Sequence, residues 1–208
     1  MQEISLSLRE RNRMETWSAV HEAAAGLTLE AGLAAVTVDA ISARAGVSKR
    51  TFFNYFPSKE DAIIGVRAPT IPADLLRAFR ESGDDLLTRT VRLLAETLRV
   101  SAVADVSIER RRQLIRAHPE LRSRILQHIT AVEQLVDTVL SERLGDADSV
   151  APIAQLPDRD GSPRALLMLA GTITRFAFSQ NPGSTVDELG DNIESAIQTF
   201  REVVKTTL

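Results

Sequence analysis

The chain of 208 residues contains no cysteine. This absence excludes disulfide bonds, thiolate zinc sites, iron–sulfur clusters and a cysteine nucleophile. Aromatic residues are also scarce, at 4% of the chain, whereas alanine and leucine are abundant. Such a composition favours helices over sheet.

Neither sign of charge dominates, since the chain contains 25 Lys and Arg residues and 28 Asp and Glu residues. The whole protein is therefore not attracted to nucleic acid or to an acidic membrane, and any such contact needs a local basic patch. The longest apolar run, residues 165–174, is too short to span a bilayer. Residues 1–7 lack the basic start and apolar stretch of a signal peptide. We therefore expect a cytoplasmic protein without membrane contact.

Catalytic motifs are missing as well. His21 and Glu22 begin like a zinc-protease helix, but Ala25 stands where the second histidine would be. No glycine-rich phosphate loop and no serine in a nucleophile elbow occurs in the sequence. We predict that the chain is not an enzyme and that it holds no cofactor or metal.

Almost the whole chain follows a helical period, and only residues 33–38 alternate like a strand. Thr37, Ser48 and Ser58 each precede a helical pattern and are predicted to cap it. The fold class is therefore predicted to be all-α. The predicted helices cover residues 9–29, 38–45, 49–56, a segment opening at Ser58, 73–81, 84–102, 107–117, 119–144, 164–179 and 185–206.

Residues 38–59 carry the pattern with the clearest functional meaning. Gly46 allows a tight turn between two short helices, because glycine adopts positive φ at little cost. In the second helix Phe52 and Phe56 share one face, which predicts packing on the first helix. The opposite face carries cations, an amide and one aromatic ring, which is typical of a helix-turn-helix motif. These outward residues are Lys49, Arg50, Phe53 and Asn54.

The chemistry of this face suits DNA. Lysine and arginine pair with phosphate or guanine, and asparagine pairs with adenine. The hydroxyl groups of Thr51 and Tyr55 can donate to phosphate. Lys59 stands at a helix start, where a lysine is unfavourable for the helix and indicates an anionic partner. A merely solvated face, an adaptor for an acidic protein and a sequence-blind nucleic-acid binder remain as alternatives.

Residues 33–65 resemble the DNA-binding domain of the TetR family of bacterial transcriptional regulators. The matching residues are Thr37, Ile41, Ala45-Gly46-Val47-Ser48, Thr51, Phe53, Tyr55-Phe56 and Ser58-Lys59-Glu60. The resemblance implies that the helix 48–55 enters the major groove and that Thr37, Thr51, Tyr55 and Lys59 hold phosphates. Phe53 stands where the family usually has tyrosine, so only a ring contact remains there. The predicted DNA-binding residues are Thr37, Ser48, Lys49, Arg50, Thr51, Phe53, Asn54, Tyr55 and Lys59.

The same resemblance implies a second, helical domain that binds a ligand and forms a dimer. We expect the DNA-binding domain at 1–57 and the ligand-binding and dimerisation domain at 58–208. Long apolar side chains without charge predict a hydrophobic effector, although each such side chain is more often plain core than a ligand contact. The predicted pocket residues are Leu94, Leu98, Leu135, Met168, Ile173 and Phe176.

The last two predicted helices carry patterns typical of close packing. Residues 186–204 follow a seven-residue apolar repeat, and small residues form a stripe on the helix before them. We expect a homodimer, because two-fold symmetry matches a palindromic operator, and core within one subunit is the alternative. The predicted interface residues are Ala170, Gly171, Thr174, Ala177, Leu189, Ile193, Ala196, Ile197 and Phe200.

Residues 109–124 are rich in arginine and read first as a solvated face, or else as an anion site. This stretch resembles actinobacterial regulators of the same family that respond to acyl-CoA or fatty acids, including the mycofactocin-system regulator. The sequence thus predicts a homodimeric repressor that binds a double-stranded DNA operator. A small hydrophobic effector, with acyl-CoA or a fatty acid as candidates, would release it.

Overall fold

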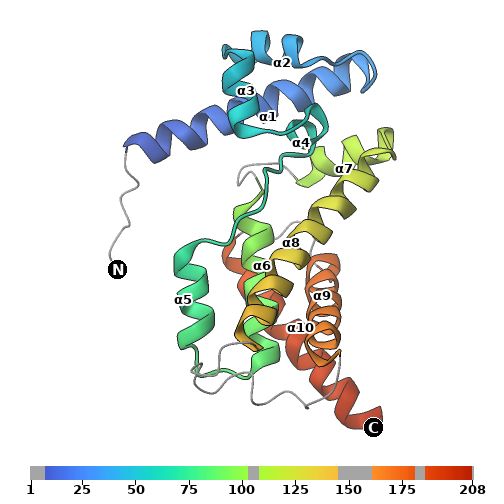
Figure 1. Ribbon diagram of the computed structural model, residues 1–208. Coiled ribbons are helices and arrows are strands. Elements are labelled where there is room, and N and C mark those ends of the chain that lie inside the picture. The colour runs from blue at the N-terminus through green and yellow to red at the C-terminus, as the bar shows by residue number, and fades with distance from the viewer. Residues whose placement is uncertain (1–7, 103–107, 145–160, 181–185, 208) are drawn as a thin grey trace. The chain divides into compact units, whose positions relative to one another are not determined.

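The computed structural model describes residues 8–102, 108–144, 161–180 and 186–207, which form ten helices (Figure 1). Within these residues the only pairing of β type is an isolated bridge between Val66 and Ala102. The all-α prediction is therefore confirmed. The helices are α1 (Leu8–Ala31), α2 (Val38–Ala45), α3 (Lys49–Tyr55), α4 (Lys59–Ile64), α5 (Ala73–Glu81), α6 (Leu86–Val100), α7 (Ile108–Ala117), α8 (Leu121–Leu144), α9 (Ser162–Gln180) and α10 (Val186–Thr207).

The chain divides into two compact units. The N-terminal unit comprises the chain up to Ala68 together with Val100–His128, and the C-terminal unit comprises Pro69–Arg99 and the chain from Ile129 onward. The predicted boundary between residues 57 and 58 thus falls inside the N-terminal unit. The reason is that α4 packs against α1, and that the chain returns to the same unit with α7 and the start of α8.

The core of the N-terminal unit is built on α1. Trp17 and Val20 of this helix pack with Ile41 of α2 and with the fully buried rings of Phe52 and Phe56. A cation also lies over the Trp17 ring, because the guanidinium of Arg67 is 4.6 Å from the ring centroid. The apolar residues of α2 and α3 predicted to face inward are therefore confirmed as core.

Side-chain caps define the short helices α2, α3 and α4. Thr37, Ser48 and Ser58 each accept a hydrogen bond from a backbone N–H in the first turn, as predicted. Each such cap typically contributes about 1 kcal/mol to helix stability. Gly46 ends α2 with φ +67°, a left-handed conformation that residues with a Cβ rarely adopt.

The C-terminal unit has a core of its own, contributed by α5, α6, the later turns of α8, α9 and α10. α9 and α10 pack side by side (Figure 1). Phe176 and Phe200 meet across this packing in an edge-to-face arrangement, with ring centroids 5.5 Å apart. No helix in the described part of the chain is both long and apolar enough to cross a membrane.

The predicted dimer interface requires a correction. The small stripe of α9 and the apolar repeat of α10 are buried within a single chain, because these two faces pack on each other and on the core of the C-terminal unit. A second copy could not contact them without opening this unit. Leu189 is the exception, since its side chain lies outside the described residues. The residues in question are Ala170, Gly171, Thr174, Ala177, Ile193, Ala196, Ile197 and, half-buried, Phe200.

Candidate nucleic-acid interface

α3 presents one polar face to solvent because its other face is fixed in the core. Ser48 caps the helix by accepting from the Thr51 backbone N–H at 3.0 Å, and the two hydroxyl groups also bond at 2.8 Å. Phe52, together with Phe56 that follows the helix, is fully buried. The four outward residues predicted from the sequence, Lys49, Arg50, Phe53 and Asn54, are all exposed, while Thr51 and Tyr55 are half-buried.

Two cations beside this face are already paired with acids. Lys49 Nζ lies 2.6 Å from Asp39 Oδ1 of α2. Arg44 donates two hydrogen bonds, of 2.8 and 2.7 Å, to the carboxylate of Glu30 in α1. Arg50 has no ion-pair partner among the described residues. The acid-free stretch 44–59 is thus partly neutralised in space, which a count along the sequence could not reveal.

Lys59 has a structural role that sequence reasoning missed. Its Nζ donates to the carbonyl oxygens of Leu33 at 3.0 Å and Val36 at 2.8 Å, in the loop between α1 and α2. These two bonds explain a lysine at a helix start without any anionic partner. An ammonium group has three donors, so one N–H is left for a phosphate. The predicted DNA contact of Lys59 stays a prediction, as does that of Thr37, which caps α2.

α4 is anchored to α8 by an ion pair in which the carboxylate is buried and the guanidinium is partly exposed. Arg124 Nε and Nη2 each lie 2.7 Å from one oxygen of the Asp61 carboxylate. Ser58 donates to Oδ2 of the same carboxylate at 2.7 Å, and the Asp61 side chain is only 3% exposed. The hydrogen-bonded carboxylate raises the pKa of the Arg124 guanidinium. Sequence reasoning took Asp61 for part of a capping box, and nothing in it pointed to Arg124.

The arginine-rich stretch has structural partners. Arg110 pairs with Glu22 of α1, and Arg124 pairs with Asp61. Arg111 is buried enough that desolvation lowers its pKa, and its Nε has no hydrogen-bond partner among the described residues. The sequence analysis interpreted this stretch as a solvated face or as an anion site, and neither interpretation included these partners. The side chain of Arg112 lies outside the described residues.

Two histidines bind neighbouring elements rather than a metal. The Nδ1 of His21 lies 2.7 Å from the carbonyl oxygen of Ala62, so Nδ1 carries the proton and ties α1 to α4. His128 Nε2 lies 2.9 Å from Ser101 Oγ. Burial lowers the pKa of both histidines. No group of three or more potential metal ligands occurs in the described parts of the chain.

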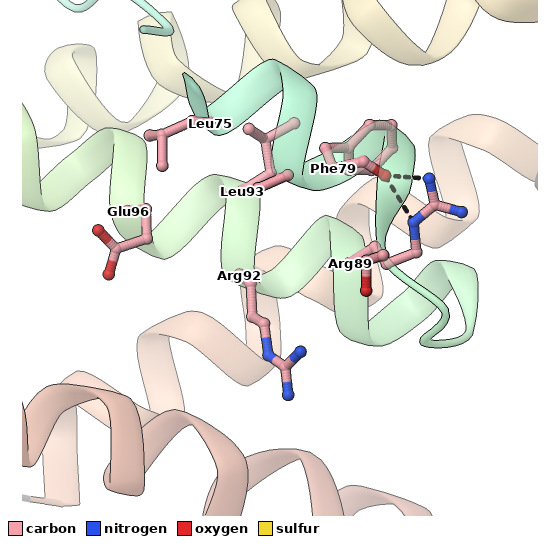
Figure 2. A pocket seen from close by; sticks show the side chains of 8 residues that line it. Leu75, Phe79, Arg89, Arg92, Leu93 and Glu96 are labelled. Carbon is pink, nitrogen blue, oxygen red and sulfur yellow. Dashed lines mark hydrogen bonds between the residues drawn. The ribbon is translucent and has the colours of Figure 1, made fainter. Parts of the chain in front are cut away.

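A hollow of about 240 Å³ lies between α5 and α6 in the C-terminal unit (Figure 2). Its surface is mainly apolar, although Arg89 and Arg92 border it. Arg89 donates two hydrogen bonds to the Phe79 carbonyl oxygen, drawn as dashed lines, and its guanidinium lies 4.8 Å from the Phe79 ring centroid. The lining residues are Leu75, Ala78, Phe79, Ser82, Arg89, Arg92, Leu93 and Glu96.

None of the six residues predicted to contact a ligand lines this hollow. Leu94 and Ile173 are core residues, and Met168 is 65% exposed. Leu98 and Phe176 pack on the core of the C-terminal unit, and Leu135 is half-buried. For Leu94, Ile173, Leu98 and Phe176, apolar periodicity selected positions that hold helices together, and protein side chains fill the space around them. The contact of the six residues with a ligand stays a prediction.

Residues 21–63 match the bacterial regulatory proteins of the tetR family. This segment of the chain is therefore of the TetR type. The matched segment runs from His21 in α1 almost to the end of α4, so it contains the exposed face of α3. The resemblance seen in residues 33–65 is therefore confirmed. Proteins of this family are DNA-binding transcriptional regulators and not enzymes, which agrees with the predictions from the sequence.

Comparison with solved structures gives a weaker likeness. The flavonoid-responsive regulator FrrA is 21% identical, with 90% of this chain and 96% of that chain covered and a TM-score of 0.30. No curated protein matches the chain. The predicted kinship with acyl-CoA-responsive actinobacterial regulators stays a prediction.

Proposed function

We propose that this protein is a sequence-specific repressor of the TetR type that a small hydrophobic molecule releases from a palindromic operator. The observation that carries the proposal is the outward face of α3. Arg50 and Asn54 are exposed there, while Phe52 and Phe56 hold the opposite face in the core. A guanidinium and an amide on one fixed helix face are the groups that read guanine and adenine in the major groove. An operator-binding repressor would act in the cytoplasm, where bacterial DNA lies.

A palindromic operator requires two copies of the chain, one for each half-site. Because the predicted interface is buried within one chain, we move the proposed contact to the outer surface of α9 and α10. Large apolar side chains are exposed there and support a partner of apolar character. They are Met168 and Phe178 on α9, and Val203 and Val204 on α10.

The hollow between α5 and α6 supports a small effector. Ligand pockets for drug-sized molecules typically enclose about 300–1,000 Å³. At about 240 Å³, this hollow is smaller than that range. The apolar walls formed by Leu75, Phe79 and Leu93 favour a compact hydrophobic molecule or one segment of a fatty acid.

The decisive experiment measures binding of the full chain to the DNA upstream of its own gene, by fluorescence anisotropy at physiological salt. A discrete site is expected to bind at least ~10³-fold more tightly than random duplex. The variant Asn54→Ala is expected to lose about tenfold on that site and little on random duplex. Equal binding to all duplexes would establish a sequence-blind binder, and no binding at all would favour the adaptor.

A further inference from the structure

Phe53 is the only exposed aromatic residue of the N-terminal unit. Its side chain is 55% exposed, whereas Trp17, Phe52 and Phe56 are buried and Tyr55 is half-buried. A single exposed apolar residue is common on protein surfaces and needs no explanation by itself. Phe53 differs because it is exposed on α3 next to Arg50 and Asn54, and because its ring is held in place.

A series of aromatic contacts connects this ring to the core of the N-terminal unit. Phe53 meets Phe52 edge to face, with ring centroids 5.3 Å apart and an interplanar angle of 88°. Phe52 in turn lies 6.1 Å from Phe56, and Phe56 lies 6.3 Å from Trp17 in the core. Edge-to-face contacts of this kind are favourable beyond the area they bury. The exposed ring is therefore preorganised by the core and does not have to be ordered when a partner binds.

The chemistry of the ring restricts what it can contact on DNA. It has no hydroxyl group, so it cannot donate to a phosphate as Tyr55 or Thr51 can. In the major groove the only apolar group that a base edge presents is the 5-methyl group of thymine. An apolar ring held beside Arg50 and Asn54 is complementary to that methyl group and to no other base edge.

Resting on the proposed sequence-specific binding, the geometry points to Phe53 as a specificity-determining residue that reads a thymine 5-methyl group in each half-site. Arg50 and Asn54 supply hydrogen bonds from the neighbouring exposed positions, and Phe53 adds an apolar contact that these two residues cannot make. The contact discriminates thymine from cytosine by the methyl group alone. It also distinguishes thymine from uracil, which differs only by lacking this group.

The test uses an operator selected from random duplexes with the full-length wild-type chain. Deoxyuridine replaces each thymine in turn, at symmetric positions of both half-sites, and the Kd is measured by anisotropy. One thymine position is expected at which the replacement weakens wild-type binding about fourfold per half-site, or roughly 16-fold for both. Phe53→Ala is expected to bind the thymine and uracil operators equally, and Phe53→Leu is expected to keep part of the discrimination.

Two results would overturn the inference. One is equal wild-type binding to every uracil-substituted operator. The other is a Phe53→Ala variant that is weakened by the same factor on thymine and uracil, which would indicate contact with the sugar-phosphate backbone. Thermal melting of both variants verifies that α3 remains folded. If selection yields no preferred sequence, the proposed function itself fails. If it yields a preferred sequence but the effect of replacing thymine by uracil does not depend on Phe53, only the role of Phe53 is refuted.

Discussion

Arg124 in α8 binds both carboxylate oxygens of Asp61 in α4, at 2.7 Å each, and Ser58 completes the shell around that carboxylate. The pair joins residues 63 positions apart, and it attaches α4 to a helix that continues into the C-terminal unit. Removing one partner of a buried pair leaves the other charge uncompensated, which typically costs about 3–5 kcal/mol. The stability of α4 therefore depends on a helix outside the segment matched to the family.

Replacing Arg124 by methionine is expected to lower the free energy of unfolding by about 3 kcal/mol, because the Asp61 carboxylate stays buried without its partner. Chemical denaturation measures the change. Arg122→Met is the matched control, since Arg122 is exposed on the same helix and the same truncation there removes no buried pair. Equal stability of the two variants would show that the ion pair contributes nothing.

Lys59→Met is expected to destabilise the N-terminal unit by about 2 kcal/mol, because it removes two hydrogen bonds to the loop between α1 and α2. The same variant tests the predicted phosphate contact through the salt dependence of DNA binding. If Lys59 also contacts a phosphate, the slope of log K against log salt falls by about one. An unchanged slope with lowered stability would leave Lys59 with the structural role alone.

Asp39→Asn is expected to tighten DNA binding about twofold to fivefold, because it frees Lys49 and removes a negative charge beside the outward face of α3. The salt dependence of binding becomes steeper as well. Glu81→Gln makes the same change of charge on α5 in the C-terminal unit and is expected to have no effect. Weaker binding by Asp39→Asn would mean that the pair positions Lys49 instead of competing for it.

Mild acid is expected to destabilise the N-terminal unit through His21 and His128. Burial lowers the pKa of both histidines in the folded chain, so below about pH 6.5 the unfolded chain binds more protons. Stability is therefore complete above this pH and falls as the pH drops toward the folded-state pKa values. Urea midpoints at pH 7.5 and 5.5 measure the loss. His21→Asn keeps a donor for the Ala62 carbonyl and is expected to reduce the pH dependence. An unchanged pH dependence in this variant would exclude His21 as its source.

Ala78→Leu tests the hollow between α5 and α6. Ala78 lines the hollow and is exposed, so a larger side chain there occupies ligand space without disturbing the core. The effector is identified by native mass spectrometry of protein purified from its own host. Ala78→Leu is expected to abolish the rise in melting temperature that this effector causes, while operator binding is kept. Ala73→Leu, which is exposed on α5 and does not line the hollow, is the control, and a normal response in both variants would place the effector elsewhere.

Local patterns were sufficient to predict α2, α3 and α4. Their caps depend on a hydroxyl group three residues before the N–H that it accepts from. The burial of α3 depends on two aromatic residues four positions apart, Phe52 and Phe56. Both signals lie within one or two helical turns. The predicted outward face of α3 was accordingly correct, because fixing Phe52 in the core determines where Lys49, Arg50 and Asn54 point.

Long-range pairs could not be predicted in the same way. The partners Asp61 and Arg124 belong to helices far apart in the chain, and the sequence identifies each charge without its neighbour. The predicted dimer interface failed for a related reason. Apolar periodicity shows that a face of α9 or α10 is buried, but it does not show whether the covering surface belongs to the same chain or to another.

The position of Trp17, the only tryptophan in the chain, gives the protein an intrinsic optical probe. Its indole is buried and contacts the Arg67 guanidinium and the Phe56 ring, both in the N-terminal unit, so its fluorescence reports on that unit. Circular dichroism, in contrast, follows the helices of both units. Coincident melting curves from the two signals would mean that the regulator unfolds as one cooperative block, and separated curves would give the stability of each unit in a single unlabelled sample.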